Sequence, residues 1–156
     1  MCIRDSVWGG NNILGVDKMF EYYPPAKKLS KNDSLHWSVT GLDCSGLLYE
    51  ATNGFSPRNT HQLVQFGNAV EIKGKSSAEI AAELKPLDLI VWKGHIIIVY
   101  DSNTTIESSH SANGVVKKNL RKVLENLTSK RKPVNKWSDE VPNSFVIRRW
   151  FDTSTR

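Results

Sequence analysis

The sequence predicts an α+β fold, with helices from the first part of the chain packed on a small antiparallel sheet from the second part. Two observations favour this class: short segments with helical spacing of apolar residues precede Pro86, and β-branched or aromatic runs separated by turn sequences follow it. Because the two kinds of segment do not alternate, we do not expect a doubly wound parallel sheet. The length of 156 residues and the hydrophobic content of 39% suit one domain with a real core.

The helical half begins with an irregular stretch. Residues 7–40 contain Gly9-Gly10, Pro24-Pro25 and a polar run, so we expect a long surface connection with at most one short helix. A helix is predicted over Cys44–Ala51, with Asp43 as its N-cap and Asn53-Gly54 as its stop. Further short helices are expected at 60–66 and at 77–84, the second one opened by a capping box of Ser76 and Glu79.

The second half reads mainly as strands. We expect strands at 88–92, 95–101, 104–108 and 144–151, a helix along the apolar stripe of 120–127, and a polar loop at 130–140. The first three strands are separated by turn sequences of only two residues, which predicts that they are adjacent and antiparallel.

The first six residues look foreign to the rest of the chain. Read back into codons, Met-Cys-Ile-Arg-Asp-Ser resembles the transposase end sequence used in sequencing-library preparation, so we interpret 1–6 as an adapter artefact and 7–156 as a single domain. On this hypothesis the native start is missing and Cys2 is not native. Cys44 is then the lone cysteine, and no intrachain disulfide is expected.

Charge and hydropathy exclude some classes. The net charge of +5 makes an anionic partner electrostatically plausible, but the basic residues are scattered and accompany no nucleic-acid-binding motif, so no nucleic-acid partner is expected. The longest apolar run, 89–100, is interrupted by Lys93 and His95 and is too short to span a bilayer.

Cys44 is the first candidate for chemistry. A cysteine in the first turn of a helix lies in a field that favours the thiolate, because the unpaired N–H groups there attract negative charge. The alternative is a small buried hydrophobic residue. Its neighbours Asp43, Ser45 and Gly46 are small or polar, which suits a partly open pocket better than a packed core.

His95 is the second candidate, because it begins an otherwise apolar strand. If the Cys44 helix packs on the sheet, the imidazole can take the thiol proton, and a third polar group should orient the ring. Glu107 is expected directly across the hairpin from His95, with His110 as the alternative third residue. The cysteine and the dispersed histidines lack the short paired spacings of a zinc site, and no phosphate-binding loop occurs, so neither a metal nor a cofactor is expected.

Five short motifs, in order along the chain, resemble those of the NlpC/P60 family. They are Trp8-Gly9-Gly10, Asp43-Cys44-Ser45-Gly46-Leu47, Pro57-Arg58-Asn59-Thr60 with Gln62 and Gln65, Pro86-Leu87-Asp88-Leu89, and Gly94-His95 followed by an apolar strand. The resemblance implies a papain-like α+β fold and cysteine peptidase action on peptides of the bacterial cell wall. It implies Cys44 as nucleophile, His95 as base and Glu107 in the slot of the third polar residue.

The resemblance also implies the setting of that activity. Trp8, Asp43, Ser45 and Arg58 are expected to bind substrate, although Arg58 has a neighbouring carboxylate as its alternative partner. The implied substrate is a peptidoglycan stem peptide, and we expect a monomer in the cell envelope or outside the cell. The alternative functions are a CHAP-like peptidoglycan amidase and a catalytically silent wall-binding module of the same fold.

The sequence departs from the family pattern at three places. Glu107 occupies a slot that usually holds histidine, asparagine or glutamine, and a carboxylate there is expected to stabilise the imidazolium. Leu87 stands where a glycine is usual. The segment between Gly10 and Asp43 is longer than is common and is expected to form a lid or wall.

Overall fold

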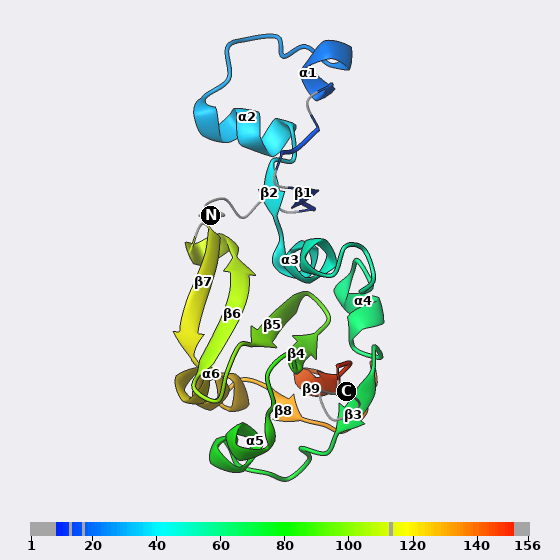
Figure 1. Ribbon diagram of the computed structural model, residues 1–156, viewed down its shortest axis with the longest axis vertical. Coiled ribbons are helices and arrows are strands. Elements are labelled where there is room, and N and C mark those ends of the chain that lie inside the picture. The colour runs from blue at the N-terminus through cyan, green and yellow to red at the C-terminus, as the bar shows by residue number, and fades with distance from the viewer. Residues whose placement is uncertain (1–8, 13, 17, 113, 152–156) are drawn as a thin grey trace.

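The computed structural model describes residues 9–12, 14–16, 18–112 and 114–151 (Figure 1). The helices are α1 (Met19–Tyr22), α2 (Lys31–Trp37), α3 (Cys44–Ala51), α4 (Thr60–Leu63), α5 (Ser77–Glu83) and α6 (Leu120–Thr128), with a 3₁₀ turn η1 (His110–Ala112). The strands are β1 (Asn11–Asn12), β2 (Gly41–Leu42), β3 (Asn68–Val70), β4 (Leu89–Trp92), β5 (His95–Val99), β6 (Thr104–Ser109), β7 (Gly114–Asn119), β8 (Lys132–Pro133) and β9 (Ser144–Arg149).

One seven-stranded sheet organises the molecule. Its order is β3-β9-β4-β5-β6-β7, and β8 pairs with β9 in parallel while the other neighbours are antiparallel. Strands β4 to β7 follow one another through short turns, whereas β9 returns from the end of the chain to lie beside β4. Strands β4 and β5, which are joined by the turn at Gly94, are therefore central strands of the sheet, and His95 begins one of them.

The sheet buries apolar side chains on both faces. Ile90, Ile97 and Phe145 belong to a core with residues of α5 and α6, whereas Leu89 and Ile96 belong to a second core with residues of α3 and α4. This alternation follows from the strand geometry, in which successive side chains point to opposite faces. The sheet is thus a middle layer, with α3 and α4 on one face and α5 and α6 on the other. The expected α+β fold, with helices packed on an antiparallel sheet, is thus confirmed, and helices cover both faces of the sheet.

Local sequence signals explain the helix boundaries. Asp43 caps α3 by accepting a hydrogen bond from the Gly46 N–H, and the predicted helix 44–51 is confirmed with both bounds. The predicted capping box at Ser76 is also confirmed, although α5 ends one residue earlier than expected. The helix at 60–66 is shorter than predicted, since α4 ends at Leu63 and looser turns follow.

Two segments differ from the sequence expectation. Residues 9–42 contain two short helices rather than at most one, because Ser30 caps α2 through the Asp33 N–H. Residues 130–140 are not simply a polar loop. They contribute β8, and Val134 and Trp137 pack partly buried against the α3-side core.

The segment before α3 forms a separate lobe. Helices α1 and α2 contain no buried residue, and the ribbon shows them projecting away from the sheet beyond β1 and β2 (Figure 1). The two strands pair with each other and lead into α3.

The adapter interpretation of residues 1–6, the nature of Cys2 and the role expected for Trp8 all fall outside the described residues.

The turn before β4 shows why glycine is favoured at position 87, where this chain has Leu87. Leu87 has φ of 72°, a left-handed conformation in which glycine is favoured because it lacks a Cβ. The following Asp88 is 1% exposed and is held by Arg149 of β9 through two hydrogen bonds of 2.8 and 2.5 Å. That ion pair fastens the turn to the sheet and supports the strained Leu87.

In the described part of the chain, none of the helices has the length and apolar character needed to cross a bilayer.

The α6-side core predicts a large effect of one truncation. Leu124 is 0% exposed and lies on the apolar face of α6. Replacement by alanine removes buried methyl groups and leaves a cavity, so Leu124→Ala is expected to lower the free energy of unfolding by about 3 kcal/mol. Chemical denaturation monitored by circular dichroism measures this. Leu14→Ala is the matched control, because Leu14 is 76% exposed, and it should change stability by less than about 0.5 kcal/mol. Equal effects of the two would contradict the assigned core.

Candidate active site

Cys44 is placed at the first residue of α3 by the residues around it. The Asp43 cap fixes the start of the helix, and Asp43 N–H donates to the Gly10 carbonyl at 2.8 Å. Gly46 lets the helix approach this segment, since a Cβ there would collide with the Gly10 carbonyl oxygen. The Cys-Ser-Gly sequence is thus the part of α3 that docks against the chain at Gly10.

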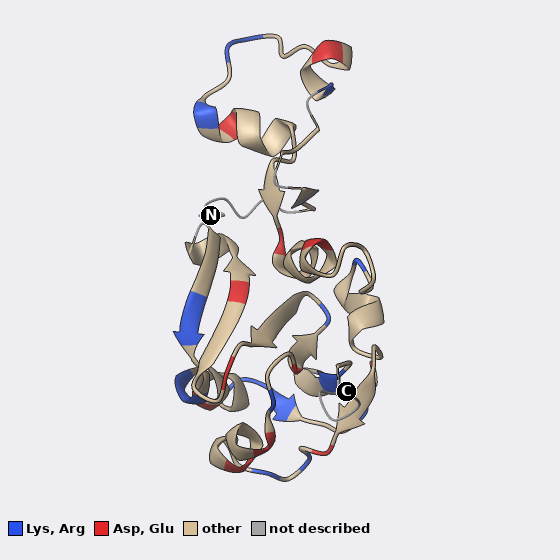
Figure 2. Cartoon of the chain, in the orientation of Figure 1, with Lys and Arg blue, Asp and Glu red and all other residues tan. Residues whose placement is uncertain are grey.

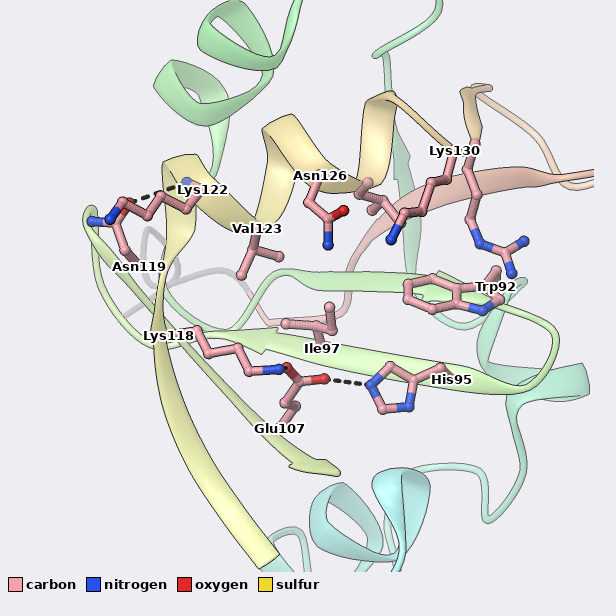
Figure 3. Close-up of a pocket in the computed structure, with 12 residues that line it drawn as sticks. Trp92, His95, Ile97, Glu107, Lys118, Asn119, Lys122, Val123, Asn126 and Lys130 are labelled. Carbon is pink, nitrogen blue, oxygen red and sulfur yellow. Dashed lines mark hydrogen bonds and ion pairs between the residues drawn. The ribbon is translucent and has the colours of Figure 1, made fainter. Parts of the chain in front are cut away.

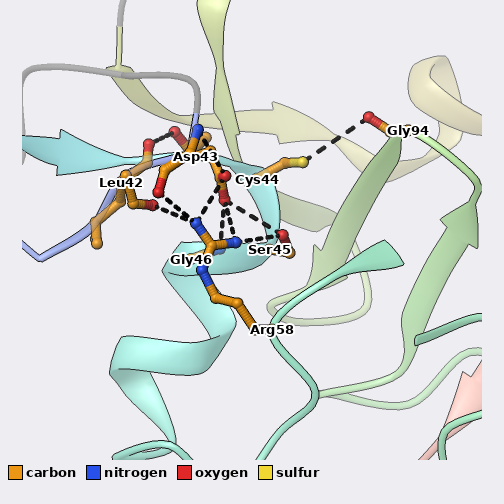
Figure 4. A network of polar contacts seen from close by, with 10 residues as sticks. Leu42, Asp43, Cys44, Ser45, Gly46, Arg58 and Gly94 are labelled. Carbon is orange, nitrogen blue, oxygen red and sulfur yellow. Dashed lines mark hydrogen bonds and ion pairs between the residues drawn. The ribbon is translucent and has the colours of Figure 1, made fainter. Parts of the chain in front are cut away.

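Arg58 ties this corner together (Figure 4). Its guanidinium donates to both carboxylate oxygens of Asp43, at 3.0 and 2.9 Å, and to the Ser45 hydroxyl at 2.9 Å. It also donates to the carbonyl oxygens of Gly9 and Gly10, at 2.8 and 3.1 Å. Because a planar guanidinium presents donors in a fixed fork, one side chain can hold the helix start and the glycine segment in a single geometry.

These contacts bear on the residues expected to bind substrate. Of the two alternatives for Arg58, the structure shows the neighbouring carboxylate as its partner, with 29% of the Arg58 side chain exposed. Asp43 and Ser45 are likewise engaged with Arg58 and with each other. The three side chains are brought together directly beside Cys44 and hold the helix that carries it.

The thiol of Cys44 faces the start of β5. Its Sγ lies 4.0 Å from the Gly94 carbonyl oxygen, and α3 packs against β5 and β6. Burial lowers the pKa of His95, but hydrogen bonds to Cys44 and Glu107, with the negative charges of both, outweigh burial and raise it from 6.5 to about 9. The structure therefore brings Cys44 and His95 together as the sequence predicts, and the cysteine is partly exposed rather than sealed in a core.

Glu107 is the residue that holds the other side of the imidazole ring. Its Oε2 lies 2.5 Å from Nε2 of His95, which leaves Nδ1 as the ring nitrogen available to Cys44 (Figure 3). The expected position directly across the hairpin is wrong by two residues. The register pairs Ile98 with Ile106, so by extension Glu107 is level with Ile97 and reaches His95 diagonally. The alternative third residue, His110, is exposed at the start of η1.

The carboxylate of Glu107 has a second cationic partner. Its Oε1 lies 2.5 Å from Nζ of Lys118 on β7, and the Glu107 side chain is 5% exposed. Burial raises the pKa of Glu107, but hydrogen bonds to His95 and Lys118, with their positive charges, outweigh it and hold the pKa below the ordinary 4.5. Glu107 is therefore an anion placed between two cations.

A groove of about 730 Å³ opens above His95 and Glu107 on the α6 side of the sheet. Figure 3 shows His95 and Glu107 along its floor and α6 as its roof. The Trp92 ring lies 5.2 Å from the His95 ring, and the Arg131 guanidinium lies 4.7 Å from Trp92. The charged residues that line the groove are Lys118, Lys122, Lys130, Arg131, Glu107 and His95. Cations outnumber the single carboxylate, so the groove favours an acidic ligand.

Sequence reasoning missed Lys118, Trp92 and the way in which Arg58 links α3 to the glycine segment. The sequence could have indicated Trp92, because Trp92 ends the strand that pairs with the His95 strand across the turn Lys93-Gly94. No local sequence pattern indicates a role for Lys118, since it reaches Glu107 only through the pairing of β6 with β7. In the described residues, no group of three or more histidine, cysteine or acidic side chains has a geometry that would hold a metal ion.

Comparison with known proteins supports the fold. No known protein family matches the sequence, and no curated protein sequence does. Among solved structures, the peptidoglycan hydrolase RipB from Mycobacterium tuberculosis is similar, with 20% identity, a TM-score of 0.55 and coverage of 97% of this chain and 59% of that one. The P60 domain of the M. avium subspecies paratuberculosis antigen MAP1204 has 17% identity and a TM-score of 0.54, over 97% of this chain and 87% of that one.

These likenesses confirm the fold that the resemblance to the NlpC/P60 family implied. The helices and the antiparallel sheet are arranged as in these solved domains. The chain spans 59% of the length of the RipB structure, so what the rest of such a protein does is not carried by the match.

The Arg58 contacts predict a stability effect. Arg58→Met leaves the 17% exposed carboxylate of Asp43 without its cation, and hydrogen bonds to charged groups of this kind contribute about 1.5–3 kcal/mol. We expect the free energy of unfolding to fall within that range in urea denaturation. Lys75→Met is the matched control, because it breaks an ion pair with the exposed Glu83 and should cost less than about 1 kcal/mol. An unchanged stability of Arg58→Met would contradict the proposed anchoring.

The raised pKa of His95 predicts a dependence of stability on pH. The folded pKa of about 9 exceeds the ordinary 6.5, so the stabilisation from protonated His95 is fully present below pH 6.5 and is lost as pH rises through 9. The lowered pKa of Glu107 acts on the other side, since its stabilisation is present above pH 4.5 and is lost as pH falls through the folded value. Unfolding measured between pH 6.5 and 9 should show the decline.

The variant Glu107→Gln isolates this contribution. It removes the carboxylate that favours the imidazolium, so the decline between pH 6.5 and 9 should become smaller. His36→Gln is the control, because His36 is exposed and its ring contacts the Asn32 carbonyl. It should keep the parent's profile. A Glu107→Gln profile identical to that of the parent would show that Glu107 does not set the titration of His95.

Proposed function

We propose that the protein is a cysteine peptidase that hydrolyses amide bonds in peptides of bacterial peptidoglycan. The observation that carries the proposal is the chain of three groups formed by Cys44 in the first turn of α3, His95 beside it, and Glu107 at 2.5 Å from the far ring nitrogen. A nucleophile, a base within its reach and a group that orients the base are the parts that covalent acyl transfer needs.

In the proposed free enzyme, Nδ1 of His95 already holds the proton taken from the Cys44 thiol. In the first step the Cys44 thiolate attacks the carbonyl carbon of the amide. A carbon–sulfur bond forms and the carbonyl electron pair moves to oxygen. When that pair returns, the carbon–nitrogen bond breaks and the leaving amine receives the proton from His95. Glu107 accepts a hydrogen bond from Nε2 throughout, which fixes the ring so that Nδ1 faces the reacting atoms.

The negative charge on oxygen requires donors at the start of α3. The Gly46 N–H donates to Asp43 and the Leu47 N–H to the Asp43 carbonyl. The preceding amides of Cys44 and Ser45 have no hydrogen-bond acceptor among the described residues. Unpaired N–H groups in the first turn of a helix can donate hydrogen bonds to an anion without any rearrangement of the backbone, so they suit the oxyanion.

The second step releases the acyl group. Water attacks the thioester carbonyl while neutral His95 accepts one of its protons, and the carbon–sulfur bond breaks. The products are the carboxylic acid and the thiolate beside protonated His95, which is the starting state. The free enzyme thus holds a proton on His95, in keeping with the pKa of about 9.

The substrate class rests on the similar structures and on the groove. RipB is a peptidoglycan hydrolase and its structure covers 97% of this chain. The cationic groove that contains His95 complements a peptide with free carboxylates, and stem peptides of the cell wall have this character. We place the site of action in the cell envelope or outside the cell, where that substrate is found.

Incubation of the purified protein with peptidoglycan tests the proposal directly. Mass spectrometry should find newly released peptide amines, and Cys44→Ala should abolish them. An electrophilic thiol probe should label the parent at neutral pH, with labelling lost in Cys44→Ser and weakened in His95→Ala. Release of products by Cys44→Ala, or absence of both cleavage and labelling in the parent, would overturn the assignment.

Two further variants test the third residue. Glu107→Ala should lower kcat by at least about 10²-fold, because it removes the group that orients the catalytic histidine, and such a group contributes on that scale. His110→Gln should retain the parent's kcat, since His110 is exposed at η1. The reverse result would assign the orienting role to His110. Cleavage between glycan and peptide, rather than within the peptide, would indicate an amidase.

A further inference from the structure

The surroundings of Glu107 contain a group that the proposed reaction does not yet use. Lys118 lies on β7, the outer neighbour of β6, and its Nζ is 2.5 Å from Oε1 of Glu107. His95 holds the other oxygen, Oε2, at the same distance. Figure 2 shows the acidic position of β6 beside a basic stretch of β7, and Figure 3 shows the Lys118 side chain directed to Glu107.

The sheet register explains this placement. Lys118 pairs with Thr105 on β6, and Glu107 is two residues further along the same face of that strand. The ammonium therefore reaches Glu107 diagonally, as Glu107 itself reaches His95. Three side chains from three adjacent strands form a row across the sheet, with charges that alternate when His95 is protonated.

We propose that Lys118 is a positioning residue of the catalytic centre. It holds one carboxylate oxygen of Glu107, and its ammonium compensates the negative charge of that carboxylate while His95 gives up its proton. This inference rests on the proposed function and adds a fourth residue to its machinery.

The physical argument concerns the moment after proton transfer. When His95 protonates the leaving amine, it becomes neutral, and Glu107 loses one of its two positive partners. Its side chain is only 5% exposed, and a buried carboxylate left without a cation is costly. Lys118 remains charged at that stage, so the carboxylate stays compensated. The imidazolium then transfers its proton more readily than it would beside an unshared carboxylate.

The same argument explains how a carboxylate can occupy a slot where the NlpC/P60 pattern usually has histidine, asparagine or glutamine. An unshared Glu107 would hold His95 in the protonated form more strongly, because the full negative charge would face the ring. Lys118 takes part of that interaction. It is 43% exposed, so solvent moderates its effect without removing it.

Titration of His95 by NMR tests the proposal without any substrate. The measurement uses the full chain carrying Cys44→Ser, which cannot turn over, and follows the ring signals of His95 with pH. In this background Lys118→Met should raise the pKa of His95 by about half a unit. Lys118→Arg should leave it near the parent's value, because the positive charge is retained. Lys122→Met is the matched control, because it removes a lysine of the same groove that is not paired with Glu107.

The activity readout follows in the chain with Cys44 intact. Lys118→Met should move the alkaline limb of the kcat/KM profile to higher pH and lower kcat more than it raises KM, with Lys118→Arg restoring both. Retention of the His95 titration in Lys118→Met, or an equal shift in Lys122→Met, would overturn the proposal. The NMR shift without peptidoglycan cleavage by the parent would support the Lys118 assignment while contradicting the proposed reaction.

Discussion

The candidate site depends on the contact that sets the first turn of α3 against the start of β5. Cys44 and His95 are far apart in the sequence, and neither residue has chemistry of this kind by itself. The contact is possible because Gly46 has no side chain to collide with Gly10, and because the α3 face carrying Leu47 and Leu48 packs on the sheet. Arg58 then fixes the corner by five hydrogen bonds. The thiol is therefore held by several independent constraints.

A second principle of the site is charge compensation in a poorly solvated place. Glu107 is nearly buried, and each of its oxygens meets one cation at 2.5 Å. This arrangement keeps the carboxylate ionised and the imidazole oriented. It also connects the proposed catalytic groups to the outer strand β7 and to the cationic groove under α6, whose lining includes His95 and Glu107 but not Cys44.

The accuracy of the sequence-based predictions varied with the range of the interaction involved. The start of α3 was predictable because its cap is three residues from its partner. The β4–β5–β6 hairpins were predictable because short turns join them. The register of Glu107 was wrong by two residues, since turn sequences fix which strands pair more firmly than which residues face each other. β8 was missed, because it pairs with a strand that follows it by a longer connection.

The sequence by itself determined the class of the fold, the helix that begins at Cys44, and the candidates Cys44, His95 and Glu107, because caps, turns and hydrophobic periods act over a few residues. Only the tertiary structure decided that Arg58 bonds to Asp43 and Ser45 and that Lys118 shares Glu107 with His95. Those contacts join residues from separate strands and loops. Their existence depends on how the sheet is ordered and how far each strand is shifted against its neighbour, and no short stretch of sequence encodes this.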